Sequence, residues 1–176
     1  SCTDVIIGDI DADGFECILK YAYCGDPEIT YKEVLDVYYI SSKYQITKVP
    51  QKSISFLSQK SYNYFKNCMN AENVCYLFDK AVQLELDEII KDCIDFINNP
   101  RITQIFASDA LLNMSLPSME QFLEKCSLPF REEKIWNKMC QWNKASAQIN
   151  KDEQDQQHKY HQDDEKEEVL SPKYNL

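Results

Sequence analysis

Apolar residues recur at helical spacing along most of this 176-residue chain, and short Gly, Pro or Asn breaks separate the runs. The first run is the amphipathic stripe of Phe15, Ile18, Leu19, Ala22 and Tyr23. Gly25 can close this helix in the left-handed conformation, and Pro27 prevents its continuation. The pattern predicts a mainly α chain of about seven or eight helices packed as antiparallel pairs. We expect one remnant strand, at residues 5–7.

Two helix starts carry recognisable signals. Thr30 is expected to cap a helix from about Tyr31 to Tyr44, with Glu33 at the reciprocal position of a capping box. This helix has little polar face, so we expect it to be buried on two sides. Asn70 is expected to cap the next strong stripe, which consists of Val74, Leu77, Phe78 and Ala81.

The charge balance narrows the classes of partner. With 29 acids and 19 bases the net charge is −10, so the chain lacks the basic surplus with which proteins bind nucleic acids or anionic membranes. No apolar run approaches the roughly 18 residues of a membrane span. We expect a cytoplasmic protein, with the nucleus as the alternative.

The eight cysteines form no Cys-x-x-Cys pair, and most fall on apolar helix faces. We expect Cys75, Cys93, Cys126 and Cys140 to be reduced, buried residues. The two histidines, His158 and His161, lie in an acidic segment expected to be disordered, which would fix no metal geometry. We therefore predict no enzyme, no cofactor and no metal site.

Six tyrosines crowd into residues 21–44: Tyr21, Tyr23, Tyr31, Tyr38, Tyr39 and Tyr44. Core packing explains most of them. Tyrosine is also enriched where proteins meet, because it offers apolar area with one polar end. A protein-binding surface is therefore the function that the composition favours.

The order of these residues resembles a known family. Residues 5–57 read "VIIGDIDADGFECILKYAYCGDPEITYKEVLDVYYISSKYQITKVPQKSISFL" and resemble the second half of a BTB (POZ) domain, with "LKYAYCG" at its Tyr-x-Tyr-Thr-Gly corner. Cys24 stands where the family usually has Thr. The blocks "NAENVCYLFDKAVQLELDEIIKDCIDFI" and "LLNMSLPSMEQFLEKCSLPFREEKIWNKMCQW" resemble a BACK domain. The combination is most similar to BTB–BACK adaptors that end in a PHR β-sandwich.

The resemblance implies a partial BTB/POZ helical cluster at 1–61, a BACK-type antiparallel helical bundle at 62–146 and a disordered acidic tail at 147–176. It implies an adaptor that binds a cullin scaffold protein of the third type within a ubiquitin ligase, and a substrate protein that the sequence does not identify. The cullin-facing residues would be Tyr23, Asp26, Tyr44, Val74, Leu77 and Phe78, with core packing as the alternative for each.

The resemblance begins at the second half of a BTB domain, and no PHR or Kelch domain follows it. We therefore expect a fragment, a truncated isoform or a diverged gene product. BTB-type homo- or hetero-oligomers are a further expectation. The alternative function is a BTB-type scaffolding module without a role in ubiquitin transfer.

Overall fold

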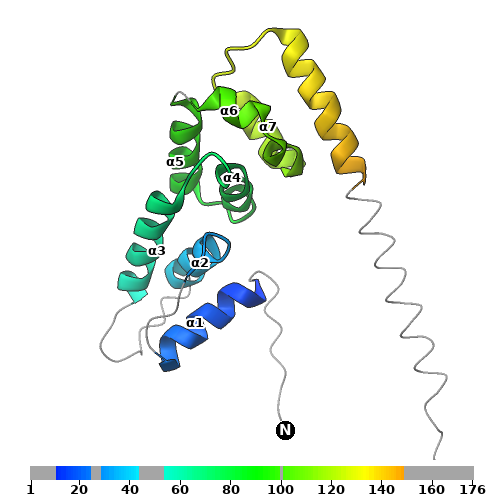
Figure 1. Ribbon diagram of the computed structural model, residues 1–176. Coiled ribbons are helices and arrows are strands. Elements are labelled where there is room, and N and C mark those ends of the chain that lie inside the picture. The colour runs from blue at the N-terminus through cyan, green and yellow to red at the C-terminus, as the bar shows by residue number, and fades with distance from the viewer. Residues whose placement is uncertain (1–10, 25–28, 44–53, 100, 149–176) are drawn as a thin grey trace, which may run out of the picture. The chain divides into compact units, whose positions relative to one another are not determined.

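The computed structural model describes residues 11–24, 29–43, 54–99 and 101–148. Within these ranges every regular element is a helix, which confirms the mainly α prediction (Figure 1). The elements are α1 (Ala12–Cys24), α2 (Val34–Lys43), α3 (Ile54–Cys68), α4 (Val74–Gln83), α5 (Asp87–Asn98), α6 (Ile102–Ala107), the 3-10 helix η1 (Asp109–Asn113), α7 (Leu116–Lys125) and a helix over residues 132–148. The strand expected at 5–7 lies outside the described residues.

The chain forms two compact units, residues 1–128 and 129–176. The boundary predicted between residues 61 and 62 falls inside α3, which runs without a break from Ile54 to Cys68. In the second unit the described helix covers residues 132–148, so residues 147 and 148 of the expected tail are helical. The rest of the expected tail lies outside the described residues.

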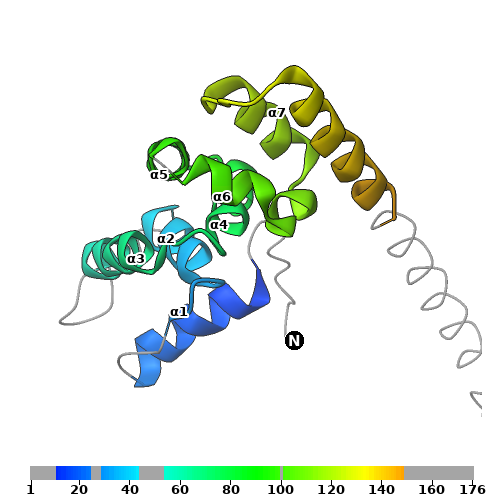
Figure 2. The same cartoon turned by 45° about the horizontal axis from the view of Figure 1, so that its top comes forward.

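In the first unit α2 packs against α1, α3 and α4, and Figure 2 shows it against α1 and α3. Its side chains Val34, Leu35, Val37 and Ile40 are at most 1% exposed. Burying four aliphatic side chains of this size contributes roughly 1.5–3 kcal/mol each. The prediction that this helix is buried on two sides is confirmed.

The start of α2 has the predicted reciprocal contact. The Thr30 backbone N–H donates to Glu33 Oε2 at 3.1 Å, and the Thr30 hydroxyl also donates to that oxygen. Thr30 Oγ1 in turn accepts from the Lys32 N–H at 3.2 Å. The helix itself begins at Val34, three residues later than expected, because residues 31–33 form a turn.

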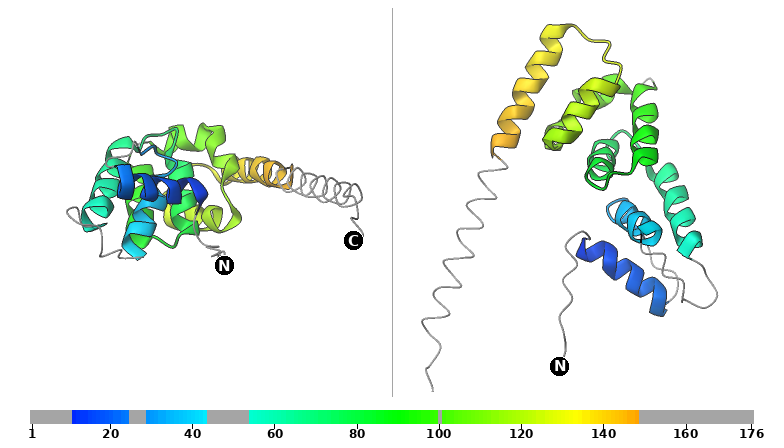
Figure 3. Two further views of the ribbon diagram at one scale, coloured as in Figure 1. Left: turned by 90° about the horizontal axis from the view of Figure 1, so that it is seen from below. Right: turned by 180° about the vertical axis from the view of Figure 1, so that it is seen from behind.

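Helices α4 and α5 pack against each other as a hairpin, and Figure 3 shows the two side by side. Before α4, the Asn70 amide oxygen accepts from the Glu72 and Asn73 N–H groups, while the Asn70 N–H donates to Asn73 Oδ1 at 2.8 Å. The Asn70 side chain therefore caps the turn of residues 71–73, whereas the N-cap residue of α4 itself is Asn73, three residues later than predicted. Both helices turn their apolar stripes into one core, with Phe78, Ala81, Ile89, Cys93 and Ile97 all fully buried.

The turn between α4 and α5 closes as a Schellman motif. The Leu86 N–H donates to the Ala81 carbonyl at 2.9 Å and the Glu85 N–H to the Val82 carbonyl at 3.2 Å. Glu85 occupies the left-handed position with φ 55°, where glycine is usual because a Cβ is disfavoured.

Glu85→Gly is expected to stabilise the first unit by about 0.5–1 kcal/mol, because it removes the left-handed penalty where the motif already exists. Urea unfolding followed by circular dichroism measures the effect. Gln83→Gly is the matched control: it places glycine in the last turn of α4 and should destabilise by roughly the same amount. Equal destabilisation by both substitutions would contradict this account of the turn.

One sequence expectation at the carboxyl side is wrong. Three of the four cysteines assigned to the interior are buried, but Cys140 is exposed. On the helix 132–148 it lies one turn after Trp136, which is 69% exposed. The apolar residues of this helix therefore occupy more than one face.

Candidate protein-binding surface

The outer face of α1 presents two apolar side chains to solvent. Tyr23 is 85% exposed and Leu19 is 41% exposed, whereas Ile18 and Tyr21 on the other side of the helix are buried. Leu19 and Tyr23 are four residues apart and therefore neighbours on the helix surface. They form an exposed ridge directly before the break at residues 25–28, which contains Asp26 and lies outside the described residues.

The inner face of α1 approaches α2 without an intervening side chain. A Cβ placed on Gly14 would lie 2.4 Å from the Cβ of Asp36, closer than carbon atoms can approach. Glycine at this position therefore lets the two helices pack closely. The contact orients α1 so that the Leu19–Tyr23 ridge points outward.

A cluster of three charges joins α1, α2 and α4. The Lys80 ammonium of α4 lies 3.1 Å from Asp36 Oδ1 of α2 and 3.5 Å from Asp11 Oδ2, just before α1. The Asp36 side chain is 5% exposed and that of Lys80 is 16% exposed. Burial raises the pKa of the Asp36 carboxyl above its ordinary value, although the hydrogen bond and charge of Lys80 oppose the rise. Burial alone would lower the pKa of the Lys80 ammonium. The hydrogen bond to Asp36 and the charges of Asp36 and Asp11 outweigh burial, so the pKa of Lys80 lies above its ordinary value.

Three residues predicted to face a partner lie in the core. Val74, Leu77 and Phe78 are all 0% exposed, so their side chains cannot touch a partner in this structure. They form the inward stripe of α4 against its neighbouring helices. The alternative reading of these three residues as core packing is therefore correct.

The exposed aromatic residue of α4 is Tyr76, which sequence reasoning did not single out. It is 41% exposed, its ring meets that of Tyr31 edge-on at 5.8 Å, and its hydroxyl donates to the Lys32 carbonyl at 3.3 Å. In the sequence Tyr76 lies off the apolar stripe of α4, and this position was the signal that could have identified it as an exposed aromatic residue. The Tyr31–Tyr76 pair links the start of α2 to α4 and adds exposed aromatic area.

A hollow of about 580 Å³ lies between the end of α2 and the α4–α5 turn. Its lining residues are Tyr39, Ser42, Lys43, Gln83, Leu84, Glu85 and Leu86. The Lys43 ammonium donates to the Tyr39 hydroxyl at 2.6 Å and lies 4.9 Å from the centre of that ring. The predicted contact residue Tyr44 follows Lys43 in the sequence and lies outside the described residues.

The cysteine thiols whose pKa departs from the ordinary value are not activated as nucleophiles. Burial raises the pKa of Cys126 to about 12 and also raises that of Cys17, Cys68 and Cys93. A reactive thiol needs a lowered pKa instead.

Among the described residues no three potential metal ligands gather, and both histidines lie outside them. In the same part of the chain no helix combines the length and apolarity needed to cross a bilayer. What the described surface offers is apolar and aromatic contact area.

Residues 1–61 match the BTB/POZ domain family, whose domain is a protein–protein interaction module. The chain is 23% identical over 145 residues to BTB/POZ domain-containing protein 6-A of Danio rerio, a match that covers 82% of this chain and 25% of that protein. It is 24% identical over 150 residues to BTB/POZ domain-containing protein 9 of Rattus norvegicus, covering 84% of this chain and 23% of that protein.

BTB/POZ domain-containing protein 3 of Homo sapiens is 20% identical over 145 residues, covering 82% of this chain and 26% of that protein. The chain thus spans about a quarter of the length of these curated relatives. No solved structure matches it significantly.

Proposed function

We propose that this chain is the docking part of a substrate adaptor for a cullin-based ubiquitin ligase. In this proposal the BTB/POZ segment is followed by BACK-type helices, as in adaptors that end in a PHR β-sandwich. The scaffold partner is the cullin of the third type, and the working compartment is the cytoplasm, with the nucleus as the alternative. The substrate would be recruited by another part of the protein.

The observation that carries this proposal is that α1 and α2, from the matched residues, form one compact unit with α4–α7 of the following segment. Helix α4, beyond the matched residues 1–61, contacts α2 and sends Lys80 to Asp36 inside that segment. The similarity to the relatives also extends over 145–150 residues, well past residue 61. Both findings support a second helical segment that belongs with the first, as a BACK domain belongs with a BTB domain.

The structure changes the residues through which docking is proposed. The Leu19–Tyr23 ridge provides the apolar anchor, because it is exposed and its neighbours Glu16 and Lys20 are paired with each other at 2.8 Å. Exposed aromatic anchors of this kind dominate many interfaces. Asp26 and Tyr44 stay predicted contacts, whereas the buried residues of α4 act only by supporting the surface.

Direct binding to the amino-terminal domain of the third cullin tests the proposal. Biolayer interferometry with the full chain is expected to give a dissociation constant of about 10 µM or tighter, as in other specific complexes of modest interface size. The corresponding domain of a different cullin is the matched control and should bind at least about tenfold more weakly. If the chain bound neither domain while capturing other protein partners, the cullin role would be excluded and the scaffolding alternative favoured.

A further inference from the structure

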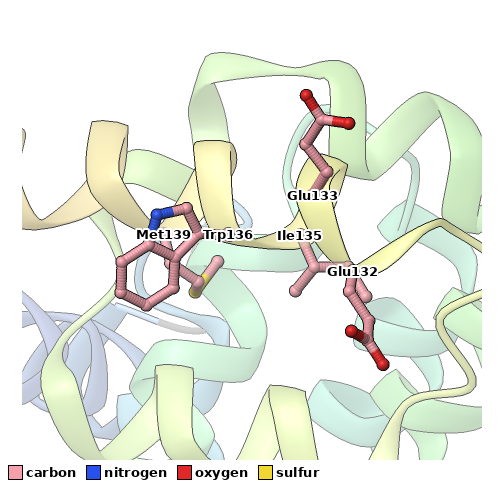
Figure 4. A pocket seen from close by; sticks show the side chains of 5 residues that line it. All are labelled: Glu132, Glu133, Ile135, Trp136 and Met139. Atoms are coloured by element: carbon pink, nitrogen blue, oxygen red, sulfur yellow. The ribbon is translucent and has the colours of Figure 1, made fainter.

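The helix over residues 132–148 has an exposed face that centres on Trp136. Trp136 is 69% exposed and Cys140, one turn later, is exposed and free. Figure 4 shows Trp136 beside Met139 and Ile135, with Glu132 and Glu133 at the rim of an open hollow of about 410 Å³. Tryptophan is one of the residue types that are enriched among the energetically dominant residues of protein interfaces.

The charges on this face are arranged to suit a second copy of the same helix. Glu133 and Lys144 are both exposed and lie eleven residues apart, close to three full turns, so they flank the Trp136–Cys140 face on the same side. One end of the face is therefore acidic and the other basic. An antiparallel second copy would place Glu133 of each chain near Lys144 of the other.

The apolar residues fit the register of the Glu133–Lys144 pairs to within one residue. In an antiparallel pair centred on residue 138, Trp136 of each copy lies opposite Cys140 of the other. The two-fold arrangement thus contains two Trp136–Cys140 contacts and two Glu133–Lys144 pairs. A parallel pair would instead oppose Glu133 to Glu133 and Lys144 to Lys144, which is repulsive. Isologous pairing of this kind is the commonest basis of homodimers.

We propose that the Trp136–Cys140 face binds a second copy of this chain as an antiparallel helix pair. Each tryptophan can bury about 150–250 Å², so the two together supply less than half of the roughly 1,200 Å² at the lower limit of stable specific interfaces. The contact should form a weak dimer, with a dissociation constant of about 10–100 µM. This surface does not include the Leu19–Tyr23 ridge, so a failure of the dimer proposal would leave the cullin proposal unaffected.

Sedimentation velocity of the full chain over a concentration series, with reductant present to prevent disulfides through Cys140, tests the proposal. Trp136→Ala is expected to weaken the dimer at least about tenfold. Glu133→Lys and Lys144→Glu should each weaken it about three- to tenfold, because each opposes like charges across both pairs. The double charge-swapped variant Glu133→Lys/Lys144→Glu should return to the wild-type constant within about twofold.

Gln141→Ala is the matched control, because Gln141 is exposed on the same helix and lies off this face. It should leave the constant unchanged, and circular dichroism of every variant confirms that the helix persists. A chain that stays monomeric up to about 0.5 mM would overturn the proposal. So would a dimer that is insensitive to Trp136→Ala, or a double variant as weak as the single ones.

Discussion

Leu77→Asp should unfold the first unit at neutral pH. Leu77 is 0% exposed on α4, which packs against α2, α5, η1 and α7. An unpaired carboxylate there would lose its hydration without gaining a partner. The expected loss is about 3–5 kcal/mol, a large part of the stability of a domain of this size. Urea unfolding followed by far-ultraviolet circular dichroism measures it.

Tyr76→Asp provides the matched control one residue away. Tyr76 is 41% exposed, so an aspartate there keeps its water and should reduce the free energy of unfolding by no more than about 1 kcal/mol. If Leu77→Asp and Tyr76→Asp had equal effects, the inward stripe of α4 would be wrongly placed.

Lys80→Met is expected to be the second most damaging change. Methionine keeps an apolar stem of similar length but removes the only lysine within 4 Å of Asp36 among the described residues. A charged group that is 5% exposed would then lack its counter-ion, which costs about 3–5 kcal/mol. The Asp36→Asn/Lys80→Met double variant removes both charges and should be more stable than the Lys80→Met variant alone. A double variant whose loss equals the sum of the single losses would show that the two residues are not coupled.

The loss of unfolding free energy in the Lys80→Met variant should depend on pH. Burial raises the folded-state pKa of Asp36 above its unfolded value, so the contribution of this group is fully present below the unfolded pKa and declines as pH rises through the folded pKa. Without Lys80 the folded pKa rises further, because the lysine opposes the effect of burial. The variant should therefore lie closer to the wild type at about pH 4 than at about pH 7, as followed by urea unfolding at both values. A pH-independent difference would refute this charge assignment.

Local signals in the sequence were enough to predict many of the helices and some of their starts. The stripe in α5 and the caps at Thr30 and Asn70 depend on residues within a few positions of one another. The Lys80–Asp36 pair joins residues 44 positions apart, and Gly14 matters only because α2 passes beside it. No local pattern encodes such contacts.

The same reason explains which site predictions changed. Periodicity identifies an apolar face but not whether the protein buries it or presents it to a partner. On α4 the predicted stripe is core, whereas on α1 the stripe is divided, with Ile18 inward and Tyr23 outward. On the helix 132–148 the same ambiguity made Cys140 a predicted interior residue, although it is exposed together with Trp136.

The most direct test of the account compares binding and stability for Tyr23→Ala in the same preparation. Tyr23 is 85% exposed, so its loss should leave the melting temperature within about 2 °C of the wild type. Affinity for the amino-terminal domain of the third cullin should fall at least about tenfold, as for an aromatic anchor. Unchanged affinity together with a lowered melting temperature would contradict the account, because Tyr23 would then stabilise the fold without contacting the partner.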